Sequence, residues 1–204
     1  MLNLEQLAEL FEKNRAAAPA RVAEFSIGGR PFPFNTRPAV MGVVNLSPES
    51  WYRESVCLTA EAAVQRGQVL ASQGADLVDV GAESTLAHAA RADAAAQNSR
   101  LLPVLRGLRA AKILASVETY SPPVARACLE AGANVLNLTG AGETGEMFRI
   151  AAAHDAAVII CHVQGGNVRD VGDFDLSADP VELMRAYFNR QIEVAQRAGL
   201  KKIL

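Results

Sequence analysis

The chain has 204 residues, of which 50% are hydrophobic and 21% are charged, and its formal net charge is −2. This composition is typical of one globular domain with a sizeable core, and it excludes a strongly basic surface for nucleic acid or an anionic membrane. The longest apolar runs are far shorter than the roughly 20 residues that cross a bilayer. We therefore expect neither a nucleic-acid partner nor a membrane.

The first residues contain acids and no basic stretch before an apolar run, so they do not resemble a secretory signal. The three cysteines, Cys57, Cys128 and Cys161, are odd in number and widely spaced. This disfavours a disulfide framework or a zinc site. Reduced cysteines are typical of a cytoplasmic protein, and we expect that location.

Residues 1–36 predict an N-terminal cap rather than a second domain. Residues 3–14 carry leucines and a phenylalanine at helical spacing. Residues 24–34 are typical of a β-hairpin that turns at Gly28 and Gly29. We assign residues 37–204 to a single domain.

From Pro38 onward, apolar runs alternate with helical patterns. The predicted strands are residues 39–45, 75–81, 112–118, 133–138 and 156–163, and residues 201–204 begin a sixth. The predicted helices are residues 59–73, 94–110, 122–131, 144–154 and 180–198. Thr59 is an expected N-cap, Gly74 and Gly132 are expected helix stops, and Pro103 is expected to distort its helix.

The predicted strands are almost wholly apolar, as in parallel strands covered by helices, so the pattern predicts an α/β fold. A TIM barrel has eight βα units in about 250 residues. This chain shows five complete units and the start of a sixth. An open doubly wound sheet would fit the length better, but no Gly-x-Gly-x-x-Gly motif follows a strand.

Each predicted strand carries a polar side chain near its C-terminal end. These residues are Asn45, Asp79, Glu118, Asn137 and His162. The C-terminal strand ends of a parallel barrel lie on one face, so we expect these side chains to converge. A carboxylate beside an asparagine amide suits a flat heterocycle with N–H, amino and carbonyl groups.

A plain structural role is also open to each of them. Asn45 could cap the following turn, Asp79 could bind backbone N–H groups, and Glu118 could be a solvated acid at a helix start. His162 could be a core histidine with satisfied hydrogen bonds. Asn137 is harder to explain in this way, because burying an unpaired amide costs roughly a few kcal/mol.

Two segments carry a family resemblance. Residues 41–50, Met-Gly-Val-Val-Asn-Leu-Ser-Pro-Glu-Ser, and residues 79–85, Asp-Val-Gly-Ala-Glu-Ser-Thr, resemble the signatures of the dihydropteroate synthase family. Residues 116–120 and 134–137 are similar to that family's third and fourth strands. The resemblance implies an incomplete TIM-barrel-type fold, with residues 37–204 as a partial pterin-binding barrel and the helix and hairpin as its cap.

The resemblance also implies a transferase of folate biosynthesis. Such an enzyme condenses 6-hydroxymethyl-dihydropterin pyrophosphate with p-aminobenzoate, with Mg²⁺ as cofactor. The substrate-binding candidates that follow are Asn45, Asp79, Thr85, Glu118, Asn137 and His162. Asn45 would lie at the pyrophosphate and bind the metal. Asp79 and Thr85 would shape the pocket, and Glu118 and Asn137 would hold the pterin edge.

The chain departs from the family pattern at Glu118, Leu138, Leu86 and Gln164, where the family has Asp, an acid, Arg and Arg. The cations of the family's last two strands have no counterpart in these 204 residues. Asp79, Glu83 and Glu118 would therefore face few cations, and such a pocket repels pyrophosphate unless Mg²⁺ is bound. We expect no synthase turnover from this chain alone, and a homodimer or a complementing chain as its partner.

Other functions stay open. The departures are also expected of a pterin- or folate-binding paralogue that lacks synthase chemistry. A methyltetrahydrofolate-binding methyltransferase barrel would use a similar pterin grip, although the segment Ser47-Pro48-Glu49-Ser50 argues against it. An α/β scaffold without any ligand would show no pterin binding that depends on Asn137.

Overall fold

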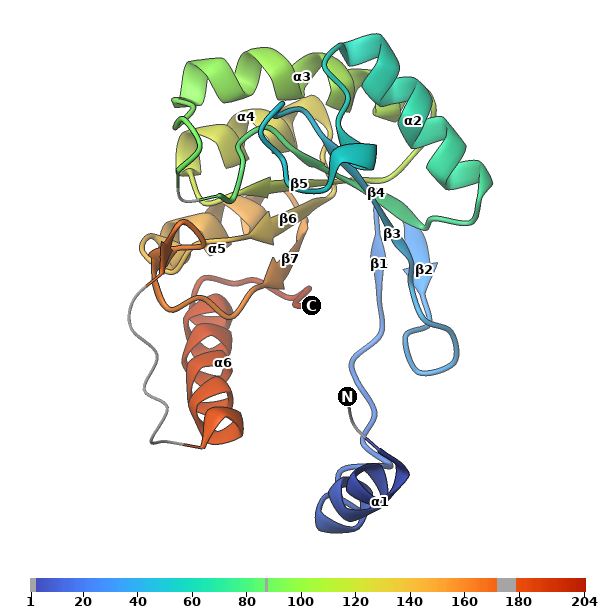
Figure 1. Cartoon of the computed structure of the whole chain (residues 1–204), viewed down its shortest axis with the longest axis vertical. Coiled ribbons are helices and arrows are strands. Elements are labelled where there is room, and N and C mark those ends of the chain that lie inside the picture. Colours follow the sequence, from blue (N-terminus) through green and yellow to red (C-terminus); the bar gives the residue numbers. More distant parts are fainter. Residues whose placement is uncertain (1–2, 87, 172–178) are drawn as a thin grey trace.

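The computed structural model describes residues 3–86, 88–171 and 179–204, and its centre is a five-stranded parallel sheet (Figure 1). The strands are β3 (Met41–Asn45), β4 (Leu77–Gly81), β5 (Ala115–Thr119), β6 (Val135–Leu138) and β7 (Ala157–Ile160). They are hydrogen-bonded in the order β3-β4-β5-β6-β7. Consecutive strands are neighbours and the order never reverses, which is the arrangement of a barrel and not of a doubly wound sheet.

The last described residues begin a sixth strand beside β7. Ile203 pairs in parallel with Val158, and the Leu204 N–H donates to the Val158 carbonyl at 2.8 Å. Figure 1 shows the C-terminus next to β7. The prediction of an incomplete TIM-barrel-type fold, with five βα units and the start of a sixth strand, is confirmed.

The helices of the repeat begin and end close to the predicted positions. They are α2 (Ala60–Ser72), α3 (Ala94–Ala110), α4 (Pro122–Ala131), α5 (Thr144–Ala153) and α6 (Pro180–Arg197). Thr59 caps α2 by accepting from the Ala62 N–H. Gly132, with φ of +112°, ends α4 in a conformation that side chains disfavour. Pro103 lies inside α3, which nevertheless runs as one helix.

The sheet has two differently packed faces. One face, with Val44, Val80 and Leu136, packs with Leu105 and Phe148 of the helices in the main core, and Figure 1 shows α2, α3 and α4 together on one side of the sheet. The alternate residues point to the inner face, because side chains alternate along a strand.

The N-terminal hairpin closes one end of this inner face. Ile27 of β1 (Phe25–Ile27) and Phe32 of β2 (Arg30–Phe32) pack on Leu77, Val135 and Ala157. These three residues are the first of their strands. The opposite end of the inner face, at the carboxyl ends of the strands, is left for polar side chains.

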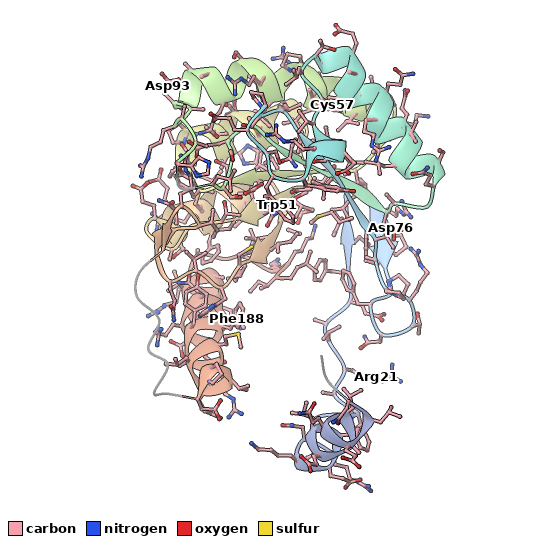
Figure 2. The ribbon with its side chains drawn as sticks, in the orientation of Figure 1. Arg21, Trp51, Cys57, Asp76, Asp93 and Phe188 are labelled. Carbon is pink, nitrogen blue, oxygen red and sulfur yellow. The ribbon has the colours of Figure 1, made fainter. Side chains whose placement is uncertain are left out.

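Asp76 fastens the hairpin to the sheet. Its side chain is 2% exposed and accepts from Arg30 Nη2 at 2.6 Å and from Arg37 Nη2 at 2.7 Å. It also accepts from the Val40 N–H at 3.0 Å. Figure 2 labels Asp76 beside the hairpin. This contact holds residues 30–40 against the start of β4.

Three features differ from the expected elements. Helix α1 (Leu4–Lys13) forms with an Asn3–Gln6 capping box, but it buries no residue. The hairpin therefore covers the sheet without help from the helix in the predicted cap. The short helix η1 (Arg53–Ser55) and the hairpin β8 (Gly165–Asn167) and β9 (Asp170–Val171) were not predicted. No helix in the described ranges combines the length and apolar character that a bilayer crossing demands.

Candidate active site

Asp79 and Asn137 form the deepest part of the polar end of the sheet. Asn137 Nδ2 donates to Asp79 Oδ2 at 3.1 Å, and the Cys161 thiol donates to Asn137 Oδ1 at 3.4 Å. Asp79 is 4% exposed, and its Oδ1 has no partner among the described residues. Burial raises the pKa of Asp79, against smaller opposing effects of Ser116 and Asn137. A buried acceptor without a partner needs an explanation, and a bound ligand supplies one.

Glu118 stands beside this pair on β5. It is in register with Gly81 on β4 and with Asn137 on β6. Burial, and then the charges of Asp79 and Glu83, raise the pKa of Glu118 to about 7. A carboxylate with this pKa changes its charge near neutral pH, as functional acids in clefts often do.

Gly81 lets two of these groups approach each other. A Cβ at this position would lie 2.9 Å from Glu118 Oε2 and 3.3 Å from Asn45 Oδ1. Such distances are too short for carbon beside oxygen without movement. The missing side chain therefore makes room for Glu118 and Asn45 above β4.

Asn45 is oriented by the loop that follows β3. Its Nδ2 donates to Ser55 Oγ at 2.7 Å, and Ser55 Oγ donates to the Tyr52 carbonyl at 2.6 Å. The amide nitrogen thus binds the loop after β3, in agreement with the turn-capping role that was the alternative for Asn45. The amide oxygen lies near Gly81 and Glu118, on the side of the polar cluster.

The expected metal requires a suitable set of donor atoms. Among the described residues, no three His, Cys, Asp or Glu side chains form a group that could hold an ion. Mg²⁺ is commonly held by one or two protein oxygens, water and substrate phosphates. The Asn45 amide oxygen fits Mg²⁺ in that manner, together with a phosphate-bearing ligand.

Thr85 lies in the loop after β4, beside Glu118. The two residues line a small polar pocket together with Tyr120 and Thr139. The structure therefore brings Thr85, Glu118, Asn137, Asp79 and Asn45 to one end of the sheet.

His162 does not join this group. Its ring packs edge-on against Tyr187 of α6, with ring centroids 4.9 Å apart, and lies 6.1 Å from the ring of Phe188, which Figure 2 labels. Adjacent residues of an extended chain point to opposite sides. Since Cys161 points to Asn137, His162 points to α6. The prediction that all five strand-end residues converge is wrong for His162.

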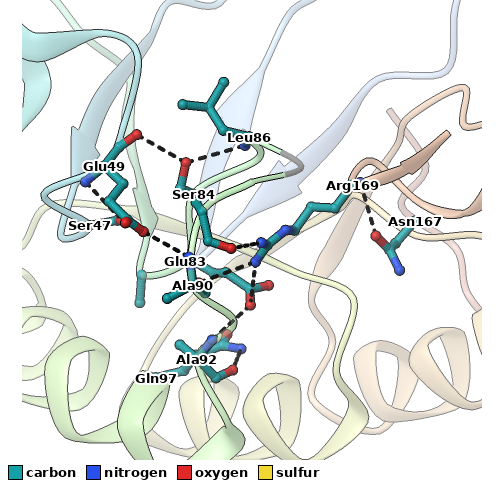
Figure 3. Close-up of polar contacts among 12 residues, drawn as sticks. Ser47, Glu49, Glu83, Ser84, Leu86, Ala90, Ala92, Gln97, Asn167 and Arg169 are labelled. Carbon is teal, nitrogen blue, oxygen red and sulfur yellow. Dashed lines mark hydrogen bonds and ion pairs between the residues drawn. The ribbon is translucent and has the colours of Figure 1, made fainter.

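Glu83 has a cation that the sequence analysis missed. Arg169 Nη1 lies 2.9 Å from Glu83 Oε1, and the two side chains are 3% and 9% exposed (Figure 3). The expectation that the acids face few cations is therefore wrong at Glu83. Arg169 belongs to the β8–β9 hairpin, for which the sequence gives no strand pattern. Gly81 and Cys161 were also missed, although Gly81 lies inside a recognised signature.

Comparison with known proteins gives a consistent result. Residues 41–204 match the family described as pterin binding enzyme. A dihydropteroate synthase of Streptococcus pyogenes serotype M1 is 36% identical over 143 residues, which are 67% of this chain and 54% of that protein. The chain thus spans about half the length of the curated relatives it matches.

Solved structures share the fold. The Burkholderia cenocepacia dihydropteroate synthase complexed with 7,8-dihydropteroate superposes with a TM-score of 0.76 at 27% identity, over 89% of this chain and 61% of that one. The Xanthomonas albilineans enzyme in complex with indole-2-carboxylic acid and 6-chloroguanine gives 0.71 at 31% identity, over 88% and 62%. The family match includes every residue of the polar cluster described above. The chain belongs to the pterin-binding enzyme family.

Proposed function

We propose that this chain is the pterin-binding part of a dihydropteroate synthase. The observation that carries the proposal is the buried Oδ1 of Asp79, which has no partner among the residues that the structure describes, while Oδ2 accepts from the Asn137 amide. A pterin presents N–H, amino and carbonyl groups along one edge. Asp79 and Glu118 would accept from the donors, and Asn137 would hold Asp79 in place.

The proposed reaction joins the pterin to p-aminobenzoate. The amine attacks the methylene carbon of the pterin, the carbon–oxygen bond to pyrophosphate breaks, and the amine loses a proton. Positive charge develops on the pterin as pyrophosphate leaves. Ionised Asp79 and Glu118 would stabilise this charge, because they are fixed in a water-poor site before the reaction starts.

Other residues would hold the leaving group. Thr85 would donate a hydrogen bond from its hydroxyl to a substrate oxygen. Asn45 Oδ1, with substrate phosphates, would hold Mg²⁺, which when bound neutralises charge on departing pyrophosphate.

A pterin-binding role without synthase chemistry is the second candidate. Leu86 stands where the family has an arginine, and its backbone N–H donates to Ser84 Oγ at 3.2 Å. Arg169, the nearby cation, is already paired with Glu83. Arg169 is the one cation among the described residues that line the pocket of Thr85 and Glu118, so pyrophosphate would meet little free positive charge there, which favours ligand binding over group transfer.

The location and partners are also proposals. Cys57, Cys128 and Cys161 are free, as is usual in the cytoplasm, and we infer that compartment. The small-molecule partners would be the pterin pyrophosphate and p-aminobenzoate. A second copy or a complementing chain is the expected protein partner, and native mass spectrometry of the purified protein would detect it.

Calorimetric titration with pteroic acid tests pterin binding by the 204-residue chain. We expect saturable binding that Asp79→Asn weakens at least about tenfold, because the amide presents a donor where an acceptor is needed. Glu182→Gln, at an exposed position on α6, is the matched control and should bind normally. Absence of saturable binding, or equal binding by both variants, would reject the proposal.

A separate assay distinguishes the two candidates. Formation of dihydropteroate from the pterin pyrophosphate and p-aminobenzoate would establish the synthase. Pteroic acid binding without this product, in a form of the protein as long as the curated relatives, would establish the binding role.

A further inference from the structure

Arg169 is buried among loops that follow different strands. Its Nη1 lies 2.9 Å from Glu83 Oε1 and donates to the Ala90 carbonyl at 3.4 Å, and its Nη2 donates to the Ala89 carbonyl (Figure 3). Both terminal nitrogens of the guanidinium are thus used inside the protein. A guanidinium used in this way is a cross-link rather than an exposed anion site.

Both carboxylate oxygens of Glu83 are also bound inside the protein. Its Oε1 also accepts from the Ala92 N–H at 2.9 Å, and its Oε2 accepts from the Tyr120 hydroxyl at 2.6 Å. The pKa of Tyr120 rises to about 12, first through burial and then through Glu83. The phenol therefore stays a donor over the whole physiological pH range.

These contacts join the loops at the carboxyl end of the sheet. Glu83, Ala89 and Ala90 belong to the loop after β4, and Tyr120 follows β5. Arg169 belongs to the hairpin after β7, which is itself bonded to the loop after β6. There, the Ala141 N–H donates to the Gly166 carbonyl and the Val168 N–H donates to the Thr139 carbonyl, both at 2.9 Å. The loops after β4, β5 and β7 therefore meet at one buried ion pair, and the loop after β6 is joined to the last of them by backbone hydrogen bonds.

The Arg169–Glu83 ion pair is better suited to orienting the loops than to stabilising the folded chain. The cost of removing both charges from water offsets most of their attraction, so a buried pair is weak evidence for stability. Its geometry, however, is specific, since an arginine fork reaches three acceptors at once. Thr85 and Glu118 line the same pocket as Glu83, Tyr120 and Arg169.

We propose that Arg169 is a positioning residue of the pterin site. Through Glu83 it holds the loop after β4, which carries Thr85, and through Tyr120 it holds the segment next to Glu118. This proposal rests on the proposed function, because the site whose geometry Arg169 would maintain is the proposed pterin site. It makes the loop after β4 dependent on a hairpin that lies far along the chain, since 79 residues separate Ala90 from Arg169.

The test compares Arg169→Gln, Arg169→Lys and Tyr120→Phe with the control Arg185→Gln. Arg185 forms an exposed ion pair with Glu182, with side chains 63% and 60% exposed. Two quantities are measured on the full chain: the affinity for pteroic acid, and amide hydrogen exchange in the loop after β4 and in helix α4.

We expect Arg169→Gln to weaken pteroic acid binding at least about tenfold, because misplacement by 1 Å can cost that much or more. Exchange should become faster in the loop after β4 and stay unchanged in α4. Arg169→Lys should recover part of both effects, since an ammonium can pair with Glu83 but cannot reach all the carbonyls. Arg185→Gln should change neither.

Wild-type affinity and loop exchange in Arg169→Gln would overturn the proposal. If Arg169→Gln does not fold, Tyr120→Phe decides, because it removes one bond to Glu83 and leaves no buried charge without its partner. Faster loop exchange with weaker binding would support the proposal, and unchanged values would overturn it. If the wild-type chain itself does not bind pteroic acid, the proposed function is wrong. Amide hydrogen exchange in the loop after β4 then decides by itself whether Arg169 orders that loop.

Discussion

Asn137 on β6 reaches across β5 to Asp79 on β4, with Asn137 Nδ2 3.1 Å from Asp79 Oδ2. The strand between them places Ser116 in register with Asp79. Residues in register share a face of the sheet, and the short serine side chain leaves room for the contact. This hydrogen bond occupies Asp79 Oδ2, and Oδ1 has no partner among the described residues.

Replacing Asn137 by alanine should therefore disturb the site more than the fold. We expect Asn137→Ala to weaken pteroic acid binding at least about tenfold, because Asp79 loses the donor that orients it. The free energy of unfolding should fall by about 1 to 3 kcal/mol, the cost of a buried acceptor without its partner. Calorimetry and urea denaturation measure the two effects.

Asn134 supplies a matched control near the other end of the same strand. Its Oδ1 accepts from the Ala115 N–H at 3.1 Å, so Asn134→Ala also removes a hydrogen bond from an asparagine. It should destabilise the chain by a similar amount and leave the affinity unchanged. Equal losses of affinity in both variants would mean that Asn137 acts only through stability.

Gly81→Ala tests the close approach above β4. The added Cβ would lie 2.9 Å from Glu118 Oε2, at the end of a flexible side chain, and 3.3 Å from Asn45 Oδ1. Glu118 can move aside and Asn45 needs to yield only slightly, so the free energy of unfolding should change by less than about 1 kcal/mol. The displaced groups should lower pteroic acid affinity at least about tenfold.

Gly142→Ala is the control for this substitution. The nearest atom to its added Cβ is the Gly166 carbonyl oxygen at 4.0 Å, so neither stability nor affinity should change. A Gly81→Ala variant that binds pteroic acid normally would show that Glu118 and Asn45 need not approach each other.

The fold was predictable because its signals are local and repeat. Continuous apolar runs such as Ala157–Ile160 indicate parallel strands covered on both faces, and Thr59 and Gly132 mark helix ends by known backbone chemistry. The packing of α1 was not predictable, since its apolar spacing indicates a helix and does not say what covers it.

The site was predictable only in part. Asn45, Asp79, Glu118 and Asn137 lie at or near the carboxyl ends of consecutive parallel strands, so the rule that such ends meet brings them together. The prediction failed for His162 because β7 ends at Ile160. Beyond the end of a strand, the rule no longer fixes the direction of a side chain. Arg169 could not be found, because its pairing with Glu83 joins distant loops that no periodicity describes.

Glu118 should make stability and binding depend on pH in opposite ways. Its pKa is raised from the ordinary 4.5 to about 7 by burial first and then by Asp79 and Glu83, so folding favours the neutral acid. Its contribution to the free energy of unfolding is complete below 4.5 and is lost as the pH rises to about 7. The ionised form accepts from ring N–H groups, so pteroic acid binding should strengthen through the same range.

Glu118→Gln should remove both dependences. Urea denaturation at about pH 5 and about pH 8 would measure the first, and calorimetry across that range the second. The pKa of Asp79 is also raised. A pH dependence that persists in Glu118→Gln would therefore assign the titration to Asp79.

Asp76→Ala should weaken the attachment of the β1–β2 hairpin to the sheet and leave the polar site unchanged. Arg30 and Arg37 have side chains 50% and 52% exposed, so water can solvate them once the carboxylate is gone. The cost is then the lost hydrogen bonds, including that of the Val40 N–H, or about 2 kcal/mol in the free energy of unfolding.

The control Glu12→Ala removes an ion pair with Arg15 whose side chains are 61% and 68% exposed. It should cost less than about 0.5 kcal/mol. Pteroic acid affinity should be unchanged in both variants, because Asp76 precedes the first residue of β4 and Asp79 and Gly81 lie further along the strand. Loss of affinity in Asp76→Ala, with Glu12→Ala normal, would mean that hairpin packing reaches the carboxyl ends of the strands and sets the geometry of the pterin site.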